Sequence, residues 1–262
     1  MISQVSVKRQ ETSRLELRGV CKMQLLLYIK PKKPVTLPIN YQHILQSILY
    51  RTVSYDSELS EFVHDKGYSF GDRQYKMFQF SHLEGRYHIH QKKITFDEYM
   101  TLEIRSPENR MIQLLAHNFQ EQGIWFGDTH CQDIEAELRD YTIEETELMI
   151  QMKTPITVYS TDDDSGSTYY YTPDDDMFYE KVNDNFLRKY YAYYGVMPVS
   201  GITLEPIRIT AKDKFVTRYK QSYITGWYGT YRISGKRKYL DFLYQVGLGG
   251  KNSQGFGMFQ LL

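Results

Sequence analysis

Segments with strand and helix periodicity follow one another in the same order twice along this chain of 262 residues. In residues 23–138 the order is strand, helix, two strands, helix and strand, and residues 143–262 repeat it. This βαββαβ order predicts a ferredoxin-like module, in which helices cover one face of an antiparallel sheet. Two modules of roughly 120 residues each fit the chain length. We therefore expect an α+β fold with two tandem ferredoxin-like domains.

Apolar periodicity and turn residues set the bounds of the expected elements. In the first domain we expect a loop at 30–38, strands at 23–29, 76–81, 86–94, 100–104 and 124–134, and helices at 40–53, 56–64 and 107–120. In the second domain we expect strands at 147–159, 168–171, 202–210, 214–224, 227–233 and 256–262, and helices at 173–194 and 236–246. The strands 76–81 and 86–94 are expected to form a hairpin.

The C-terminal segment 247–262 is a glycine-rich loop that runs into a short apolar strand. It reads Gly-apolar-Gly, five residues, Gly-apolar-Gly, with glycines at Gly247, Gly249, Gly255 and Gly257. Glycine permits positive φ angles and close approach of a ligand to the backbone. The five intervening residues include Lys251, Asn252 and Ser253, whose cation and hydrogen-bonding groups suit phosphate oxygens. The segment is thus a candidate phosphate-binding loop.

Two common nucleotide-binding motifs do not fit this loop. A Walker A motif requires glycine and Ser or Thr at the positions of Gln245 and Asn252, and a dinucleotide fingerprint requires a third glycine at Asn252. The order here is also helix, loop, strand, which is the reverse of both motifs. An ordinary glycine-rich turn before a terminal strand remains the alternative.

Charge is unevenly distributed, although 32 basic and 32 acidic residues give a formal net charge of zero. Residues 132–188 hold fifteen acidic and four basic residues, whereas residues 205–262 hold three acidic and ten basic ones. A basic face can attract a polyanion even on a neutral protein. The candidate contacts to the phosphates of such a polyanion are Lys236, Arg237 and Lys238 at a helix start beside the loop, together with Arg218 and Lys220. Trp227 and Tyr228, at an expected hairpin tip, either stack on a base or pack in the core.

Metal, disulfide and membrane classes receive no support from the sequence. Cys21 and Cys131 are far apart and have no ligand-like neighbours, which predicts a reducing compartment and no structural zinc. His82, His88 and His90 lack the nearby carboxylate pair that would make them a convincing metal site. No run approaches the length of a membrane span, and residues 1–22 lack a signal-peptide core, so we expect a cytoplasmic protein with a flexible N-terminal extension.

The segment 244–258, YQVGLGGKNSQGFGM, resembles the C-terminal glycine-rich signature of the CRISPR repeat-processing endoribonucleases. These belong to a superfamily of RNA-binding proteins with ferredoxin-like domains. The resemblance implies the tandem architecture, RNA binding by the C-terminal domain and its loop, and chemistry in the N-terminal domain without a cofactor or metal.

The segments LQSILY, LSEFVHDKG and KMFQFS resemble the active-site segments of the same family in order and context. The resemblance places Tyr50 on the first helix, His64 at the end of the second and Lys76 before the next strand. It implies that His64 is a general acid or base, that Tyr50 orients or protonates, and that Lys76 stabilises charge on the phosphate. Lys66 is a second candidate for the lysine role, because the stretch 67–75 is longer than usual in the family.

Each of these residues also has a structural interpretation. His64 could complement a helix dipole, Tyr50 could share a core face with His43, and Lys76 could be an edge charge.

The function that follows from the resemblance is metal-independent cleavage of CRISPR transcripts within their repeats. The expected chemistry is attack by a 2′-hydroxyl, which leaves a 2′,3′-cyclic phosphate or 3′-phosphate and a 5′-hydroxyl. The expected partner is CRISPR repeat RNA, and the resemblance leaves open a CRISPR effector complex and a homodimer as further partners. A non-cleaving RNA-binding subunit with the same fold is the alternative function.

Overall fold

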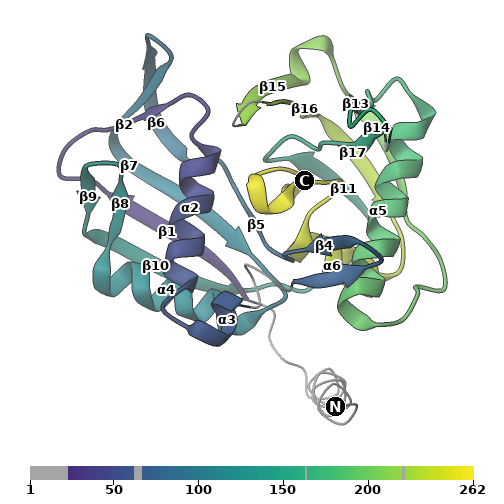
Figure 1. The fold of residues 1–262 in the computed structure, drawn as a ribbon, viewed down its shortest axis with the longest axis horizontal. Coiled ribbons are helices and arrows are strands. Elements are labelled where there is room, and N and C mark those ends of the chain that lie inside the picture. Colours follow the sequence, from purple (N-terminus) through teal and green to yellow (C-terminus); the bar gives the residue numbers. More distant parts are fainter. Residues whose placement is uncertain (1–22, 62–66, 163, 220–221) are drawn as a thin grey trace.

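The computed structural model describes residues 23–61, 67–162, 164–219 and 222–262. Two halves lie side by side, each with its own antiparallel sheet and helices (Figure 1). Each half also has its own cluster of buried apolar side chains. Both halves have the βαββαβ order, so the expected α+β architecture is confirmed. Among the described helices, none is long and apolar enough to cross a membrane.

The first sheet is built around β1 (Met23–Lys30). This strand pairs with β10 (Asp133–Asp140) on one side and β7 (Lys93–Arg105) on the other. Strands β2 (Val35–Pro38) and β6 (Glu84–His90) both pair with residues 93–96 of β7, and β5 (Gln79–Phe80) pairs with its C-terminal end. Helices α2 (Gln42–Val53) and α4 (Asn109–Gln122) lie side by side against this sheet (Figure 1). Alternate residues of β1 point into the core, where Leu25, Leu27 and Ile29 are fully buried.

The second sheet has the order β14 (Thr203–Arg208), β17 (Thr230–Ser234), β11 (Glu147–Met152) and β18 (Phe259–Leu261). Its helices are α5 (Asp176–Tyr194) and α6 (Arg237–Val246). In α5 the buried residues Phe178, Val182 and Phe186 recur every four positions, which places one face of the helix in the core. The short helix η3 (Asn252–Gln254) lies within the glycine-rich loop, directly before β18.

Each half also sends a hairpin across to the other half. Strands β3 (Tyr68–Phe70) and β4 (Arg73–Tyr75) leave the first half and pack on α5, where the rings of Tyr68 and Tyr193 are 4.9 Å apart. This hairpin, dark blue in Figure 1, lies among the elements of the second half. Strands β15 (Lys214–Tyr219) and β16 (Ser222–Trp227) extend in the opposite direction, and Asn40 Nδ2 donates to the Arg218 carbonyl at 2.9 Å. The two halves are therefore interleaved.

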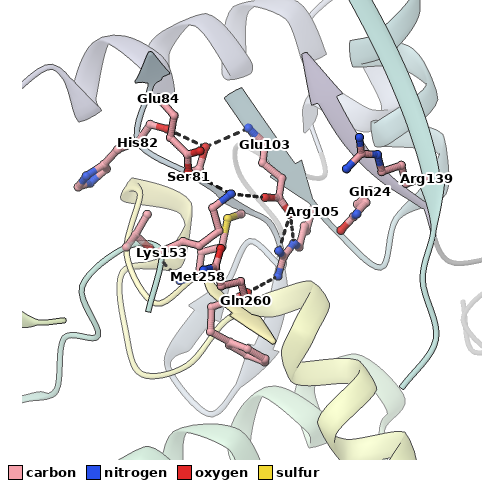
Figure 2. A network of polar contacts seen from close by, with 12 residues as sticks. Gln24, Ser81, His82, Glu84, Glu103, Arg105, Arg139, Lys153, Met258 and Gln260 are labelled. Carbon is pink, nitrogen blue, oxygen red and sulfur yellow. Dashed lines mark hydrogen bonds and ion pairs between the residues drawn. The ribbon is translucent and has the colours of Figure 1, made fainter. Parts of the chain in front are cut away.

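A buried ionic network joins the halves at their centre. Figure 2 shows Glu103 between Arg105 and Lys153, with Lys153 also paired to Glu84. The Arg105 side chain is only 2% exposed, lies 3.7 Å from the centre of the Tyr244 ring and donates to the Phe259 carbonyl at 2.8 Å. Burial alone would raise the pKa of Glu103, but the two cations outweigh it and leave that pKa below its ordinary value. The first half contributes Glu84, Glu103 and Arg105, and the second half contributes Lys153, Tyr244 and the Phe259 carbonyl.

Several expected strand bounds in the first half are wrong. The expected loop at 30–38 contains β2, and the expected partners 76–81 and 86–94 do not pair with each other, because β5 and β6 both pair with β7. Strand β7 runs through three consecutive exposed residues, Asp97, Glu98 and Tyr99, which interrupt its apolar alternation and hide its true length. The stretch 124–134 forms the hairpin of β8 (Ile124–Phe126) and β9 (Thr129–Cys131), followed by the start of β10.

The expected single strand at 214–224 is also wrong, since β15 and β16 form a hairpin over this stretch. Consequently Trp227 and Tyr228 do not lie at a hairpin tip. Trp227 ends β16 and is packed in the core of the second half, and the Tyr228 hydroxyl is 3.2 Å from His82 Nδ1. Of the two interpretations of these rings, packing is the one observed.

The remaining described elements are short: α3 (Ser57–Glu61), the hairpin of β12 (Tyr159–Thr161) and β13 (Thr168–Tyr170), and the helix η2 (Ala211–Asp213).

Candidate functional site

A pocket of about 450 Å³ lies where the two halves meet. The first half supplies the chain from Arg73 to Phe78, and the second half supplies α5, β12 and the glycine-rich loop. Four residues predicted from the sequence line it together, Lys76, Lys251, Asn252 and Ser253. Arg73 and the buried Lys189 also line the pocket, which therefore has four basic side chains. A pocket with this many basic side chains suits a polyanionic ligand.

The glycines of the loop shape its backbone. Gly247, Gly249, Gly255 and Gly257 all have positive φ angles, between 62° and 85°. A Cβ atom at Gly255 would lie 2.9 Å from the Phe80 ring on β5, so glycine is required for contact with the first half. All four glycines are buried, whereas Gly250, Lys251, Ser253 and Gln254 are partly exposed. Within the loop, these four residues are the ones that a ligand can reach.

Lys189 on α5 is hydrogen-bonded to the glycine-rich loop. This residue was not predicted from the sequence as part of the site. Its ammonium donates to the carbonyls of Gly247 and Gly249, both at 2.9 Å, and to Asn252 Oδ1 at 2.6 Å. The side chain is 3% exposed, and burial lowers the pKa of Lys189 to about 7. The sequence signal was its position three residues after Phe186 on the apolar face of α5.

Asn252 braces the loop from within. Its Nδ2 group donates to the carbonyls of Leu248 and Phe256, both at 3.0 Å, while its Oδ1 accepts from Lys189. Both amide hydrogens are therefore used inside the protein. The prediction that Asn252 contacts RNA remains untested, but the observed contacts give it a structural role.

Lys251, in the glycine-rich loop, lines the pocket. Its Nζ atom lies 4.5 Å from the centre of the Tyr159 ring, a cation–π contact. Burial lowers the pKa of Lys251 from its ordinary value. The cation is thus held against β12 at the pocket wall.

Tyr50, near the end of α2, lies close to the loop. Its ring makes an edge contact with Phe78, which lines the pocket, at a centroid distance of 5.8 Å. Burial raises the pKa of Tyr50, and a hydrogen bond with Ser253 acts in the opposite direction without reversing the shift. The hydroxyl therefore stays protonated near neutral pH and can donate a hydrogen bond or a proton, but it cannot act as a base.

Gln46, one turn before Tyr50, links three elements. Its Nε2 donates to the Ser253 carbonyl at 2.8 Å, and its Oε1 accepts from the Tyr219 hydroxyl at 2.5 Å. Gln46 thus ties α2 to the loop and to the β15–β16 hairpin. Arg218, the exposed neighbour of Tyr219, is brought to the same region.

Lys76 lies directly after β4 and lines the pocket. A Cβ atom at Gly67 would be 3.6 Å from Lys76 Nζ, so the lysine packs across the backbone at Gly67. His64 and Lys66 lie outside the described residues, as does Lys220. Their predicted roles, and the choice between Lys66 and Lys76, therefore stay predictions.

The expected closeness of Lys236, Arg237 and Lys238 to the loop is wrong. These residues lie at the start of α6, and the loop begins after its end at Val246. Ten helical residues span about 15 Å, which places the basic cluster at the far end of the helix. Lys238 Nζ lies 5.5 Å from the centre of the Tyr239 ring. RNA binding by Lys236 and Arg237 remains a prediction, now for a surface separate from the pocket.

The histidines of the first half are found in two different settings. His82 is partly buried between the halves, with its ring 5.6 Å from that of Phe215, and desolvation lowers its pKa to about 4. His88 is exposed and its Nδ1 lies 3.0 Å from Asp97 Oδ2. Over the described ranges, no group of three or more His, Cys, Asp or Glu side chains is arranged to hold a metal ion.

Fold and site together define a tandem ferredoxin-like protein whose C-terminal glycine loop is built into the contact between its two domains. The sequence model of the family "CRISPR associated protein Cas6, C-terminal" matches residues 135–261. The chain is also 26% identical to "CRISPR-associated endoribonuclease Cas6 1" of Methanocaldococcus jannaschii over 249 residues, which are 90% of this chain and 91% of that protein. The chain is thus similar to a Cas6 protein along most of its length, and its residues 135–261 match the C-terminal model of that family.

Solved structures agree with this assignment at the level of the fold. "Characterization of a Cas6-related gene from Pyrococcus furiosus" aligns with a TM-score of 0.77 and 20% identity, over 92% of this chain and 98% of that one. "CRISPR associated protein Cas6" aligns with a TM-score of 0.73 and 23% identity, over 92% and 99%. The resemblance to the CRISPR repeat-processing family is thus confirmed.

Proposed function

We propose that the protein is a metal-independent endoribonuclease that cuts CRISPR transcripts within their repeats. The observation that carries the proposal is the convergence of Tyr50, Lys76 and Lys251 around one inter-domain region, although they are far apart in the sequence. The Methanocaldococcus jannaschii relative that aligns along 90% of this chain is named an endoribonuclease, which supports the same activity.

The proposed reaction is an attack by a ribose 2′-hydroxyl on the adjacent phosphorus. The new P–O2′ bond replaces the P–O5′ bond, so the products are a 2′,3′-cyclic phosphate, which water opens to a 3′-phosphate, and a 5′-hydroxyl. A base removes the 2′-hydroxyl proton and an acid protonates the departing 5′-oxygen.

In this proposal the residues divide the work by their protonation states. Tyr50, protonated near neutral pH, donates to a phosphate or leaving-group oxygen. Lys76 stabilises the negative charge on the phosphate, as its position on the pocket wall allows. His64, whose role rests on the family resemblance, exchanges the proton of the 2′-hydroxyl. Lys251 and Arg218 bind flanking phosphates.

The decisive experiment is cleavage of the repeat RNA in excess EDTA by the wild type and by Tyr50→Phe, His64→Ala and Lys76→Ala, under single-turnover conditions. We expect the wild type to cut, a 2′-deoxy sugar at the cut to block the reaction, and Tyr50→Phe to slow it by roughly tenfold to a hundredfold with unchanged RNA affinity. Tyr99→Phe, which alters an exposed tyrosine on β7, is the matched control. Cleavage that stops in EDTA refutes metal independence, and binding without products favours a non-cleaving RNA-binding subunit.

A further inference from the structure

The pocket between the halves holds polar atoms that the mechanism above does not use. Asn185 on α5 and Gln254 in the loop both line it. The Asn185 Oδ1 and Gln254 Oε1 atoms are buried, and neither has a hydrogen-bond partner among the described residues. An unsatisfied buried oxygen is costly, so these two amide oxygens, together with the buried hydroxyl of Tyr75 on the same pocket wall, indicate a site whose partner comes from outside the chain.

The chemistry of these atoms restricts the partner. The two buried amide oxygens need hydrogen-bond donors, which phosphate oxygens do not offer, while the NH2 groups of the same side chains can donate in turn. The N–H groups on the edge of a nucleobase are suitable donors, and amide side chains are the usual readers of base edges. The cations Arg73, Lys76 and Lys251 line the same pocket and suit the phosphate of the same nucleotide. A volume of about 450 Å³ falls within the usual range for a small organic ligand.

We propose that Asn185 and Gln254 form a base-recognition site for one unpaired nucleotide of the RNA next to the cleaved phosphate. The base enters the pocket with its N–H edge toward the two amide oxygens, while its phosphate faces the lysines. This proposal rests on the proposed function, because it takes the RNA bound at Tyr50 and Lys76 as the ligand.

The hairpin of β3 and β4 forms one wall of this site. Its end supplies Arg73, Gln74 and Tyr75 to the pocket wall, and it is fixed on α5 by the contact between Phe70 and Tyr191 at 5.3 Å. The pocket is therefore lined by the hairpin as well as by the glycine loop, and the hairpin packs on α5, the helix that carries Asn185.

Specificity for the base is tested by a set of repeat RNAs, each with one abasic nucleotide and a 2′-deoxy sugar at the mapped cut. Affinity is measured by fluorescence anisotropy for the wild type, Asn185→Leu and Gln254→Met. We expect the wild type to lose about tenfold or more in affinity at one position beside the cut. Each variant should show less than about a twofold difference between base and no base at that position. Gln113→Leu, which removes an exposed amide on α4, should behave like the wild type.

The outcomes separate this proposal from the proposed function. If the wild type binds every abasic RNA equally, or if both variants keep its preference, the base site is refuted and water satisfies the two amides. If RNA with normal sugars binds but is not cut, cleavage is refuted while the anisotropy series, scanned over every repeat position, still decides on the base site. If no repeat RNA binds, both proposals fail. Thermal melting of Asn185→Leu checks its fold, and Gln254→Met provides the second, independent variant.

Discussion

Replacing Lys189 by methionine should loosen the glycine loop while keeping the apolar stem of the side chain. The ammonium donates to two loop carbonyls and to Asn252, and the site is closed to water at 3% exposure. The substitution leaves three buried acceptors without this donor. Each such loss costs about 1–3 kcal/mol, but removing a buried charge recovers part of the cost, so we expect a net loss of about 1–3 kcal/mol at pH 7.

The effect should depend on pH because burial lowers the pKa of Lys189 to about 7 from an ordinary value of 10.5. Between these two values the unfolded chain binds a proton that the folded chain lacks, so this group makes the wild type more stable as the pH rises. Over two pH units inside this window, one proton contributes at most about 2.7 kcal/mol. The methionine variant lacks this contribution.

Urea unfolding of both proteins at pH 7.5 and 9.5 measures the difference. We expect the gap between wild type and Lys189→Met to widen by about 2 kcal/mol at the higher pH, and repeat cleavage by the variant at pH 7.5 to fall by roughly tenfold. Lys181→Met, which changes a partly exposed lysine paired with Asp184 on the same helix, is the control and should change stability by less than about 0.5 kcal/mol. A gap that stays constant with pH would refute a lowered pKa, and unchanged cleavage would refute a positioning role for Lys189.

Two further predictions concern the contact between the halves. Burial lowers the pKa of His82 to about 4, so as the pH falls the unfolded chain binds this proton before the folded chain does, and the free energy of unfolding should drop by up to about 3 kcal/mol between pH 6.5 and 4. His82→Leu should lack this acid sensitivity in urea titrations. If the free energy of unfolding depends on pH equally in both proteins, the prediction is contradicted. Lys153→Met leaves Glu103 with one cation instead of two and should lower the free energy of unfolding by about 2–3 kcal/mol. The control Lys93→Met, at an exposed lysine, should lower it by less than about 0.5 kcal/mol. Equal losses of stability in the two variants would show that the central network does not stabilise the fold.

The order of elements was predictable from the sequence because it depends on local periodicity. The buried stripe of α5 and the alternation of β1 are visible without knowledge of tertiary contacts. Strands whose pairing depends on remote partners were not predictable in the same way. Four of the thirteen residues of β7, 93–96, pair with both β2 and β6, and β5 pairs further along. The sequence could not show that one strand has all these partners.

The sequence predicted residues that line or adjoin the pocket, but not the buried lysine that holds the glycine-rich loop in place. Tyr50, Lys76 and Lys251 stood out through resemblance, and the structure brings them to one region. Lys189 was missed because a lysine in a polar helix usually lies in solvent, and only its spacing from Phe186 indicated burial. The cluster at Lys236 was misplaced because nearness in sequence was taken for nearness in space across a ten-residue helix.

The interleaving of the two halves has a consequence for biosynthesis. Tyr50 and Lys76 belong to the first half, but the pocket beside them is lined by α5 and by a loop that ends one residue before β18. A growing chain on the ribosome therefore presents Tyr50 long before residues 247–257 are available to dock against β5. The proposed nuclease site therefore cannot form on a partly synthesised chain, and the protein should be unable to cut RNA until its synthesis is complete.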